Sequence, residues 1–135
     1  HIAYINESFC FVGDTLFGSG CGRLFEGSPT QMVTSLKKLI GKINPSAEIF
    51  CAHEYTLSNL NFAKSLNPNY FANYNESKKK LRDKGAFTVP LNLDDELVYN
   101  PFLMVLDENK ARLLGYDQTN VINNFADLRQ RKDNF

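Results

Sequence analysis

The sequence lacks a long apolar run, a charge bias and a paired set of cysteines. Because no stretch approaches the ~18 apolar residues of a membrane span, we expect no membrane association. Lys plus Arg number 15 and Asp plus Glu also number 15, which argues against nucleic acid as a partner. The three cysteines have no paired spacing, which is typical of reduced thiols in a reducing compartment.

An initiating methionine is also absent, because the chain begins at His1. A targeting signal before this residue would not be visible, so we expect a cytoplasmic protein and keep an organelle as an alternative. What the chain does have is 135 residues with a 43% apolar fraction. This is enough for one packed domain, or for one small domain and part of another.

The first part of the chain predicts the order strand, strand, helix, strand. Strands are expected at residues 2–5 and 9–12, and a third at about 48–53. Glycines and small polar residues predict a long loop at residues 18–28.

The helix that follows this loop is predicted by both its start and its periodicity. Ser28 is a good N-cap, Pro29 suits the first helical position, and Gln31 completes a capping box. Apolar side chains then recur at helical spacing, so we expect one face to be buried. These side chains are Met32, Leu36, Leu39, Ile40 and Ile43.

From Thr56 onward the sequence predicts mainly helices, without a flexible linker near Tyr55. The expected helical segments are residues 57–66, about 71–84, a short turn at about 94–99, and about 120–133. The sequence therefore predicts a change of structure near residue 55, with strands and one helix before it and helices after it.

Asp14 and His53 each end one of the strand-like apolar runs. A strand that ends in a metal-capable side chain places it at the rim of a sheet, so we expect the two side chains within about 7 Å of each other, in reach of one metal position. Asp14 could equally be a general base or a turn residue, and His53 a structural histidine. Zinc takes about four ligands, so most of a metal site would lie outside these 135 residues.

Two familiar motifs do not fit the chain. Glu54 follows His53, but no second histidine stands four residues on, so the helical zinc-protease motif fails. The glycine-rich residues 18–23 match neither a dinucleotide fingerprint nor a P-loop. Their backbone could still approach a ligand closely, with Arg23 offering a cation to an anionic group.

The chain nevertheless resembles one family along almost its whole length, through an ordered set of short motifs. These are V-G-D-T-L-F at 12–17, G-C-G-R at 20–23, F-E-G at 25–27, H-E-Y-T at 53–56, T-V-P at 88–90, Y-N-P-F at 99–102 and R-K-D-N-F at 131–135. In this order and spacing they resemble glyoxalase II, the hydroxyacylglutathione hydrolases.

The resemblance implies an α+β fold and a specific reaction. Residues 1–55 would be the C-terminal part of a metallo-β-lactamase-like αββα sandwich, and residues 56–135 a helical substrate-binding domain. The family hydrolyses S-D-lactoylglutathione to D-lactate and glutathione at a centre of two divalent metal ions. Zinc is usual there, and iron and manganese also occur. By resemblance, Asp14 bridges the two ions, and His53 binds the second.

Five further residues match substrate positions of the family. Arg23 stands where a Lys or Arg lies near the thioester, and Phe25 stands where a Tyr is frequent, so one hydroxyl contact is missing. Tyr55 matches a tyrosine that contacts the glutathione backbone. Arg129 and Lys132 match basic residues that receive the glycine carboxylate of glutathione. Without the resemblance, the last two would be taken as solvated cations at a helix end.

The chain departs from the family at its N-terminal side. The T-H-x-H-x-D-H metal motif is absent, and His1 matches the segment after the next histidine ligand, so we do not count it as a ligand. The chain thus looks like the C-terminal half of the enzyme. We expect this half alone to be inactive, with an exposed strand edge and apolar face, and the intact enzyme to be a monomer.

Two alternatives remain beside the hydrolase. One is a related persulfide dioxygenase with a single iron, against which the helical region after Thr56 and the pair Arg129 and Lys132 both argue. The other is a non-catalytic fragment that binds glutathione conjugates or serves as an interaction module. The missing metal motif keeps this last alternative open for the 135 residues by themselves.

Overall fold

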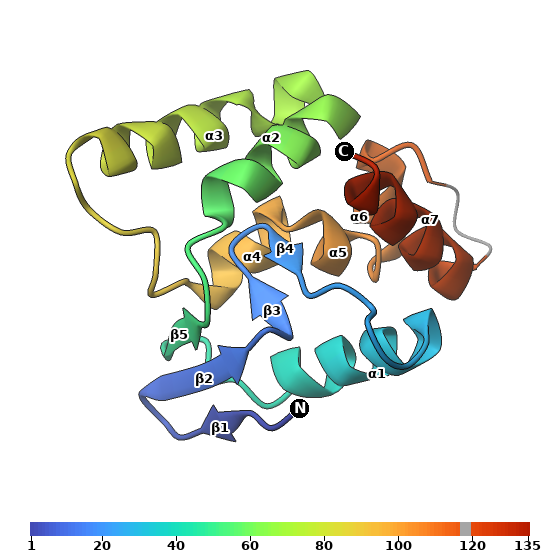
Figure 1. Cartoon of the computed structure of the whole chain (residues 1–135), viewed down its shortest axis with the longest axis horizontal. Helices are drawn as coiled ribbons and strands as arrows, with labels where there is room; N and C mark the ends of the chain where they lie inside the picture. Colours follow the sequence, from blue (N-terminus) through green and yellow to red (C-terminus); the bar gives the residue numbers. More distant parts are fainter. Residues whose placement is uncertain (117–119) are drawn as a thin grey trace.

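The computed structural model describes residues 1–116 and 120–135, and it combines a small sheet with a mainly helical second part (Figure 1). The sheet contains β1 (Tyr4–Ile5), β2 (Phe9–Gly13) and β5 (Glu48–Cys51) in the order β1-β2-β5. β1 and β2 are antiparallel, whereas β2 and β5 are parallel. Because parallel strands end at the same edge of a sheet, the residues that follow β2 and β5 lie next to each other.

The sheet is buried on one side only. In β2, Cys10 and Val12 are fully buried, whereas Phe9 and Phe11 alternate with them and are 42% and 51% exposed. The Phe11 ring stacks on Phe50 of β5 at a centroid distance of 5.3 Å on this open side. The expectation of an exposed apolar face is therefore confirmed.

A short hairpin lies between β2 and the first helix, and it corrects the expected loop at 18–28. β3 (Leu16–Phe17) and β4 (Gly20–Cys21) are antiparallel and pair Phe17 with Gly20. Gly18 and Ser19 thus form a two-residue turn, in which Ser19 has a φ of 53°. Two-residue strands are too short for an alternating pattern to be recognised in the sequence.

Helix α1 (Pro29–Ile40) confirms the predicted start. The Ser28 hydroxyl accepts from the Gln31 N–H at 3.3 Å, and the Gln31 side chain accepts from the Ser28 N–H at 2.8 Å, which completes the capping box. The helix ends at Ile40, a few residues before the expected end, although Ile43 beyond it is buried as expected. α1 supplies the crossover between the parallel strands and packs against the last helix of the chain.

The second part is helical, as predicted, but has more helices than the sequence indicated. They are α2 (Thr56–Leu66), α3 (Pro68–Asp83), α4 (Leu93–Tyr99), α5 (Pro101–Met104), α6 (Glu108–Leu113) and α7 (Val121–Asp133). α3 begins at Pro68 rather than near 71, because the Asn67 side chain caps it by accepting from the Tyr70 N–H at 3.1 Å. α5 and α6 were not predicted, since four and six residues show no helical period.

The main core joins both parts of the chain. It places Val12 and Ile49 of the sheet with Leu36 of α1 and with Phe102 and Phe125 of the helical part, all 0–1% exposed. A second, smaller cluster is formed by Leu60, Ala63, Phe71, Met104 and Leu114. Among the residues described, we find no helix with both the length and the apolar character needed to cross a membrane.

Candidate functional site

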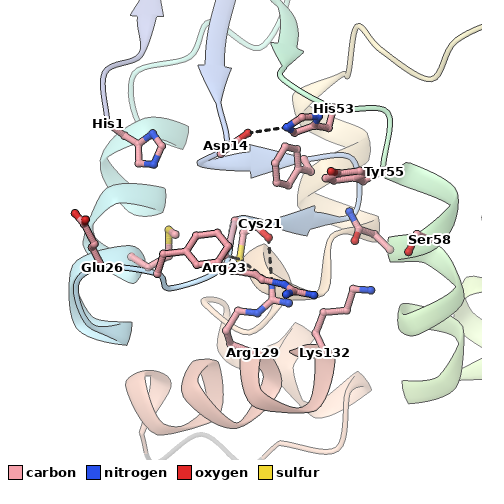
Figure 2. A pocket seen from close by; sticks show the side chains of 15 residues that line it. His1, Asp14, Cys21, Arg23, Glu26, His53, Tyr55, Ser58, Arg129 and Lys132 are labelled. Atoms are coloured by element: carbon pink, nitrogen blue, oxygen red, sulfur yellow. Dashed lines mark hydrogen bonds and ion pairs between the residues drawn. The ribbon is translucent and has the colours of Figure 1, made fainter. Parts of the chain in front are cut away.

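One pocket of about 750 Å³ collects the site residues predicted from the sequence (Figure 2). It lies between the ends of β2 and β5, the β3–β4 hairpin, the start of α2, and α7. All seven predicted residues line it: Asp14, Arg23, Phe25, His53, Tyr55, Arg129 and Lys132. The sequence did not predict Phe17, Cys21 and Asn59 among the lining residues.

Asp14 and His53 face each other at one end of the pocket (Figure 2). The distance from Asp14 Oδ1 to His53 Nε2 is 3.6 Å, and both side chains are about half exposed. The predicted proximity is therefore confirmed, and it follows from the parallel pairing of β2 with β5. A register shift between Phe11 and Gly13, with Gly13 at a φ of 55°, turns the chain at the end of β2.

Aromatic rings pack against the imidazole of His53. The Tyr55 ring stacks on it at 4.8 Å, and Phe17 of the hairpin lies 5.9 Å from it and 5.3 Å from Tyr55. Cys51, which could have been a further ligand, donates its S–H to the His53 carbonyl at 3.3 Å. Burial raises the pKa of the Cys51 thiol, so the protonated thiol that donates this bond is favoured.

The turn that carries His53 and Tyr55 is fixed by a residue from beyond α3. The Thr88 N–H donates to both carboxylate oxygens of Glu54, at 3.2 and 3.1 Å. The Thr88 hydroxyl also bonds to Glu54 and to the Thr56 hydroxyl, the latter at 2.6 Å. Sequence reasoning gave Glu54 and Thr88 no role, because the pair is separated by 34 positions; the T-V-P motif was the only sign of Thr88.

Arg129 lies at the other end of the pocket and is buried, with 5% of its surface exposed. It donates to the Cys21 carbonyl at 3.0 Å and to Asp133 Oδ1 at 2.9 Å, and its guanidinium lies 4.8 Å from the Phe102 ring. Its Nε has no hydrogen-bond partner among residues 1–116 and 120–135. Arg129 is thus not a solvated helix-end cation: it ties α7 to the hairpin.

Lys132 and Arg23 complete a cationic group around Arg129. The Arg23 Nε lies 3.6 Å from Asp133 Oδ1, and the Arg23 side chain is 64% exposed. Burial lowers the pKa of Lys132, and the positive charges of Arg129 and Arg23 lower it further. A bound anion would relieve this repulsion, so this end of the pocket favours a negatively charged group.

Phe25 and Tyr55 add accessible aromatic surface to the pocket. The two residues are 86% and 48% exposed, so both rings are free to contact a bound molecule.

Comparison with known proteins shows the family of the chain. Residues 54–135 match the family model described as hydroxyacylglutathione hydrolase C-terminus. The whole chain is 44% identical to a hydroxyacylglutathione hydrolase of Shewanella baltica, 43% to one of Photobacterium profundum and 42% to one of Aliivibrio salmonicida. The chain belongs to the hydroxyacylglutathione hydrolase family. It spans about half the length of these relatives, 54%, 55% and 55% respectively.

For this member of the hydroxyacylglutathione hydrolase family, the donor chemistry of the pocket can be compared with the needs of a metal ion. Asp14 and His53 bring one carboxylate and one imidazole together at the pocket surface, a donor set that suits zinc, iron or manganese. Within residues 1–116 and 120–135, no group of three or more His, Cys, Asp or Glu is placed to hold an ion. The pair therefore fits such an ion as two of its ligands.

Proposed function

We propose that the protein to which this chain belongs hydrolyses 2-hydroxyacyl-glutathione thioesters, with S-D-lactoylglutathione giving D-lactate and glutathione. One observation carries the proposal: a single pocket has the Asp14 and His53 pair at one end and the cations Arg23, Arg129 and Lys132 at the other (Figure 2). Glutathione conjugates carry free carboxylates and a sulfur-linked acyl group, so a pocket with these two ends suits them.

The substrate would be oriented by the cationic end and the aromatic rings. Lys132 and Arg23 are the accessible cations that would receive the glycine carboxylate of glutathione. Arg129 would contribute charge, while its hydrogen bond to the Cys21 carbonyl keeps the pocket wall in place. Tyr55 would contact the glutathione backbone beside the ring of His53, and Phe25 would add apolar contact without the hydroxyl of a tyrosine.

Asp14 and His53 are the residues of this chain that would hold a centre of two divalent cations, with zinc preferred over iron or manganese. Such a centre would supply polarisation of the thioester carbonyl and acidification of water. The remaining ligands would come from residues outside this chain. Residues 1–55 would then be part of an αββα sandwich, whose second layer would cover the exposed Phe9 and Phe11, and residues 56–135 would be the substrate-binding domain.

A cytoplasmic, monomeric enzyme is part of the proposal. Cys10, Cys21 and Cys51 are all free thiols, which suits a reducing compartment. Binding of glutathione conjugates without hydrolysis is the second candidate for the 135 residues alone, because Asp14 and His53 supply only part of a coordination sphere within the described residues.

The proposal is tested by measuring turnover of S-D-lactoylglutathione by the metal-loaded protein to which this chain belongs, here called the longer protein. Turnover is detected as loss of the ultraviolet absorbance of the thioester and as release of free thiol. The 135-residue chain, assayed in parallel, should show no turnover. Replacing His53→Ala in the longer protein should abolish turnover, whereas the matched control Glu48→Gln, at an exposed strand position away from the pocket, should not change it. With a glutathione persulfide in place of the thioester, oxygen consumption would instead indicate a persulfide dioxygenase.

A further inference from the structure

The turn of the β3–β4 hairpin is held by side chains of the helical part. The Ser19 N–H donates to Glu96 Oε2 at 2.9 Å, and the Asn100 amide donates to the same oxygen at 2.8 Å. The Asn100 amide also donates to the carbonyls of Phe17 at 3.2 Å and Gly20 at 2.9 Å. Every residue from 17 to 20 except Gly18 is therefore bonded to this pair.

Asn59 of α2 holds the remaining turn residue. Its side chain donates to the Gly18 carbonyl at 3.0 Å. The fit around the turn is close, since a Cβ on Gly18 would lie 2.2 Å from Thr56 Oγ1 and one on Gly20 would lie 2.3 Å from Asn59 Nδ2. A displaced hairpin would collide with α2 on this side, so its position is tightly defined.

Glu96 is an unusual residue for the interior, with 2% of its surface exposed, and Asn100 is fully buried. Burying a carboxylate is costly unless it is well hydrogen-bonded, and the direct partners of Glu96 are a backbone N–H and an amide. Lys78 of α3, whose charge acts on Glu96, forms its ion pair with Asp95 at 3.6 Å. An apolar side chain would be cheaper to bury, which indicates that the hydrogen bonds to the hairpin are the reason for this residue.

The hairpin in turn forms one wall of the pocket. Phe17 contacts the rings of His53 and Tyr55 at 5.9 and 5.3 Å, and β4 leads directly into Gly22 and Arg23, which line the same pocket. A rotation of the hairpin would move Phe17 away from the imidazole and would change the course of the chain toward Arg23.

We propose that Glu96 and Asn100 are positioning residues that orient the β3–β4 hairpin and so hold Phe17 against His53 and Tyr55. The effect on a glutathione thioester rests on the proposed function, whereas the effect on the ring contacts does not. Asn100 contributes through its three donated bonds, and Glu96 fixes both the Asn100 amide and the turn at Ser19.

The negative charge of Glu96 can be removed without removing the two hydrogen bonds that its side chain accepts. Burial raises the pKa of Glu96 to about 7, while the bonds from Asn100 and Ser19 and the charge of Lys78 oppose this rise and Asp95 adds to it. Tyr74 of α3 and Cys51 of β5 also face its charge. Because both donors converge on Oε2, the amide oxygen of Glu96→Gln can accept both bonds, whereas Glu96→Leu accepts neither.

Nuclear magnetic resonance of the 135-residue chain tests the proposal through contacts between the Phe17 and Tyr55 rings and through exchange of the Ser19 amide. E96L should lose the ring contacts and speed Ser19 exchange at least about tenfold, while amides of α3 stay unchanged. E96Q should retain both features. The matched control Asp95→Asn removes the neighbouring carboxylate, which does not touch the hairpin, and should also retain both. Unchanged ring contacts in a folded E96L would overturn the proposal.

Two further measurements keep the proposal testable if E96L does not fold or if the proposed function is wrong. E96D keeps the charge but withdraws the acceptor by one methylene, so it should weaken the ring contacts; contacts equal to wild type would contradict the proposal. In the longer protein, E96D should lower kcat/KM for S-D-lactoylglutathione by about tenfold or more, as misplacement of a site wall does, with recovery in E96Q. Absence of turnover in wild type would remove the proposed function, and the ring contacts would still decide the role of Glu96.

Discussion

The helices and the three-stranded sheet differ in how completely they bury their phenylalanines. Within the helices, Phe71, Phe102 and Phe125 are 0–1% exposed, whereas Phe9 and Phe11 of the sheet are 42% and 51% exposed. The helical part thus has a closed core, and the sheet has packing on one side only. The open side of the sheet therefore adds little to the stability of this chain, while the pair with metal-binding chemistry, Asp14 and His53, is carried by the ends of its strands.

The pocket lies where the two parts meet, and each part contributes different side chains to it. The sheet side contributes the carboxylate and the imidazole, and the helical side contributes Arg129 and Lys132. A change in the helical core should consequently affect the whole fold, whereas a change on the open side of the sheet should affect little within these 135 residues. The following predictions test this contrast.

The largest effect is expected from Phe125→Ala compared with Phe11→Ala. Phe125 is fully buried against Phe102, so its truncation should lower the free energy of unfolding by about 3–5 kcal/mol. Phe11 is half exposed, and its truncation should cost less than about 1 kcal/mol. Urea denaturation of both variants gives the two values. Equal losses would show that the open face of the sheet is as important for stability as the closed core.

The next effect concerns the buried carboxylate of the helical part. Burial raises the pKa of Glu96 from 4.5 to about 7, which corresponds to about 3 kcal/mol as an upper bound. The native state holds the proton more tightly than the unfolded state, so this stability is fully present below about pH 4.5 and is lost as the pH rises toward 7. The stability difference between wild type and E96Q, followed by denaturation across this range, should fall with pH. A difference independent of pH would contradict the raised pKa.

A smaller effect should separate the two cations of α7. Arg129→Ala removes two charge-assisted hydrogen bonds from a buried group and should cost about 1.5–3 kcal/mol of stability. Lys132→Ala removes contacts with the Phe62 and Phe135 rings and should cost about 0.5–1 kcal/mol. Thermal denaturation of the two variants gives the comparison.

For substrate binding, we expect Lys132 to matter more than Arg129, the reverse of their order for stability. In the longer protein, replacing both should raise KM for the glutathione thioester with a much smaller loss of kcat, and added salt should weaken wild-type binding by screening the charge. Lys132→Ala alone should give most of this rise in KM, because Arg129 is already engaged by Asp133. An unchanged KM in the double variant would leave both residues with structural roles only.

The smallest effect is expected from zinc added to the 135-residue chain. Two ligands hold the ion weakly, and at a zinc concentration equal to the dissociation constant the gain in stability is about 0.4 kcal/mol. His53→Ala should remove this gain, whereas Glu26→Gln, which changes another pocket carboxylate, should not. Melting curves with zinc and with a chelator provide the measurement. A gain that survives in His53→Ala would place the zinc elsewhere.

Local signals in the sequence were sufficient for the longer helices, for the strands β2 and β5, and for one end of the pocket. The capping residues around Ser28 predicted α1, and the two strand ends predicted the approach of Asp14 to His53, because both depend on neighbouring residues or on the parallel pairing of strands. The hairpin at residues 16–21 and the short helices α5 and α6 were missed, since they are shorter than the periods that reveal strands and helices.

Long-range polar contacts could not be predicted in the same way. The burial of Glu96 depends on Ser19, which lies 77 positions away, and the burial of Arg129 depends on the Cys21 carbonyl, 108 positions away. From the sequence alone, both would be taken as ordinary charged residues on the solvent-facing side of a helix. Only the tertiary fold gives them partners, and the family resemblance predicted a substrate contact for Arg129 without indicating that it is buried.

The bond between Arg129 and the Cys21 carbonyl also has a consequence for biosynthesis. The hairpin leaves the ribosome long before α7 is made. Until then the Cys21 carbonyl faces solvent instead of the Arg129 guanidinium. A contact across 108 positions carries a large loop-closure cost and forms late. The nascent chain would therefore expose Asp14 without a finished pocket, and ligand capture would begin only after the final helix has been translated and has docked.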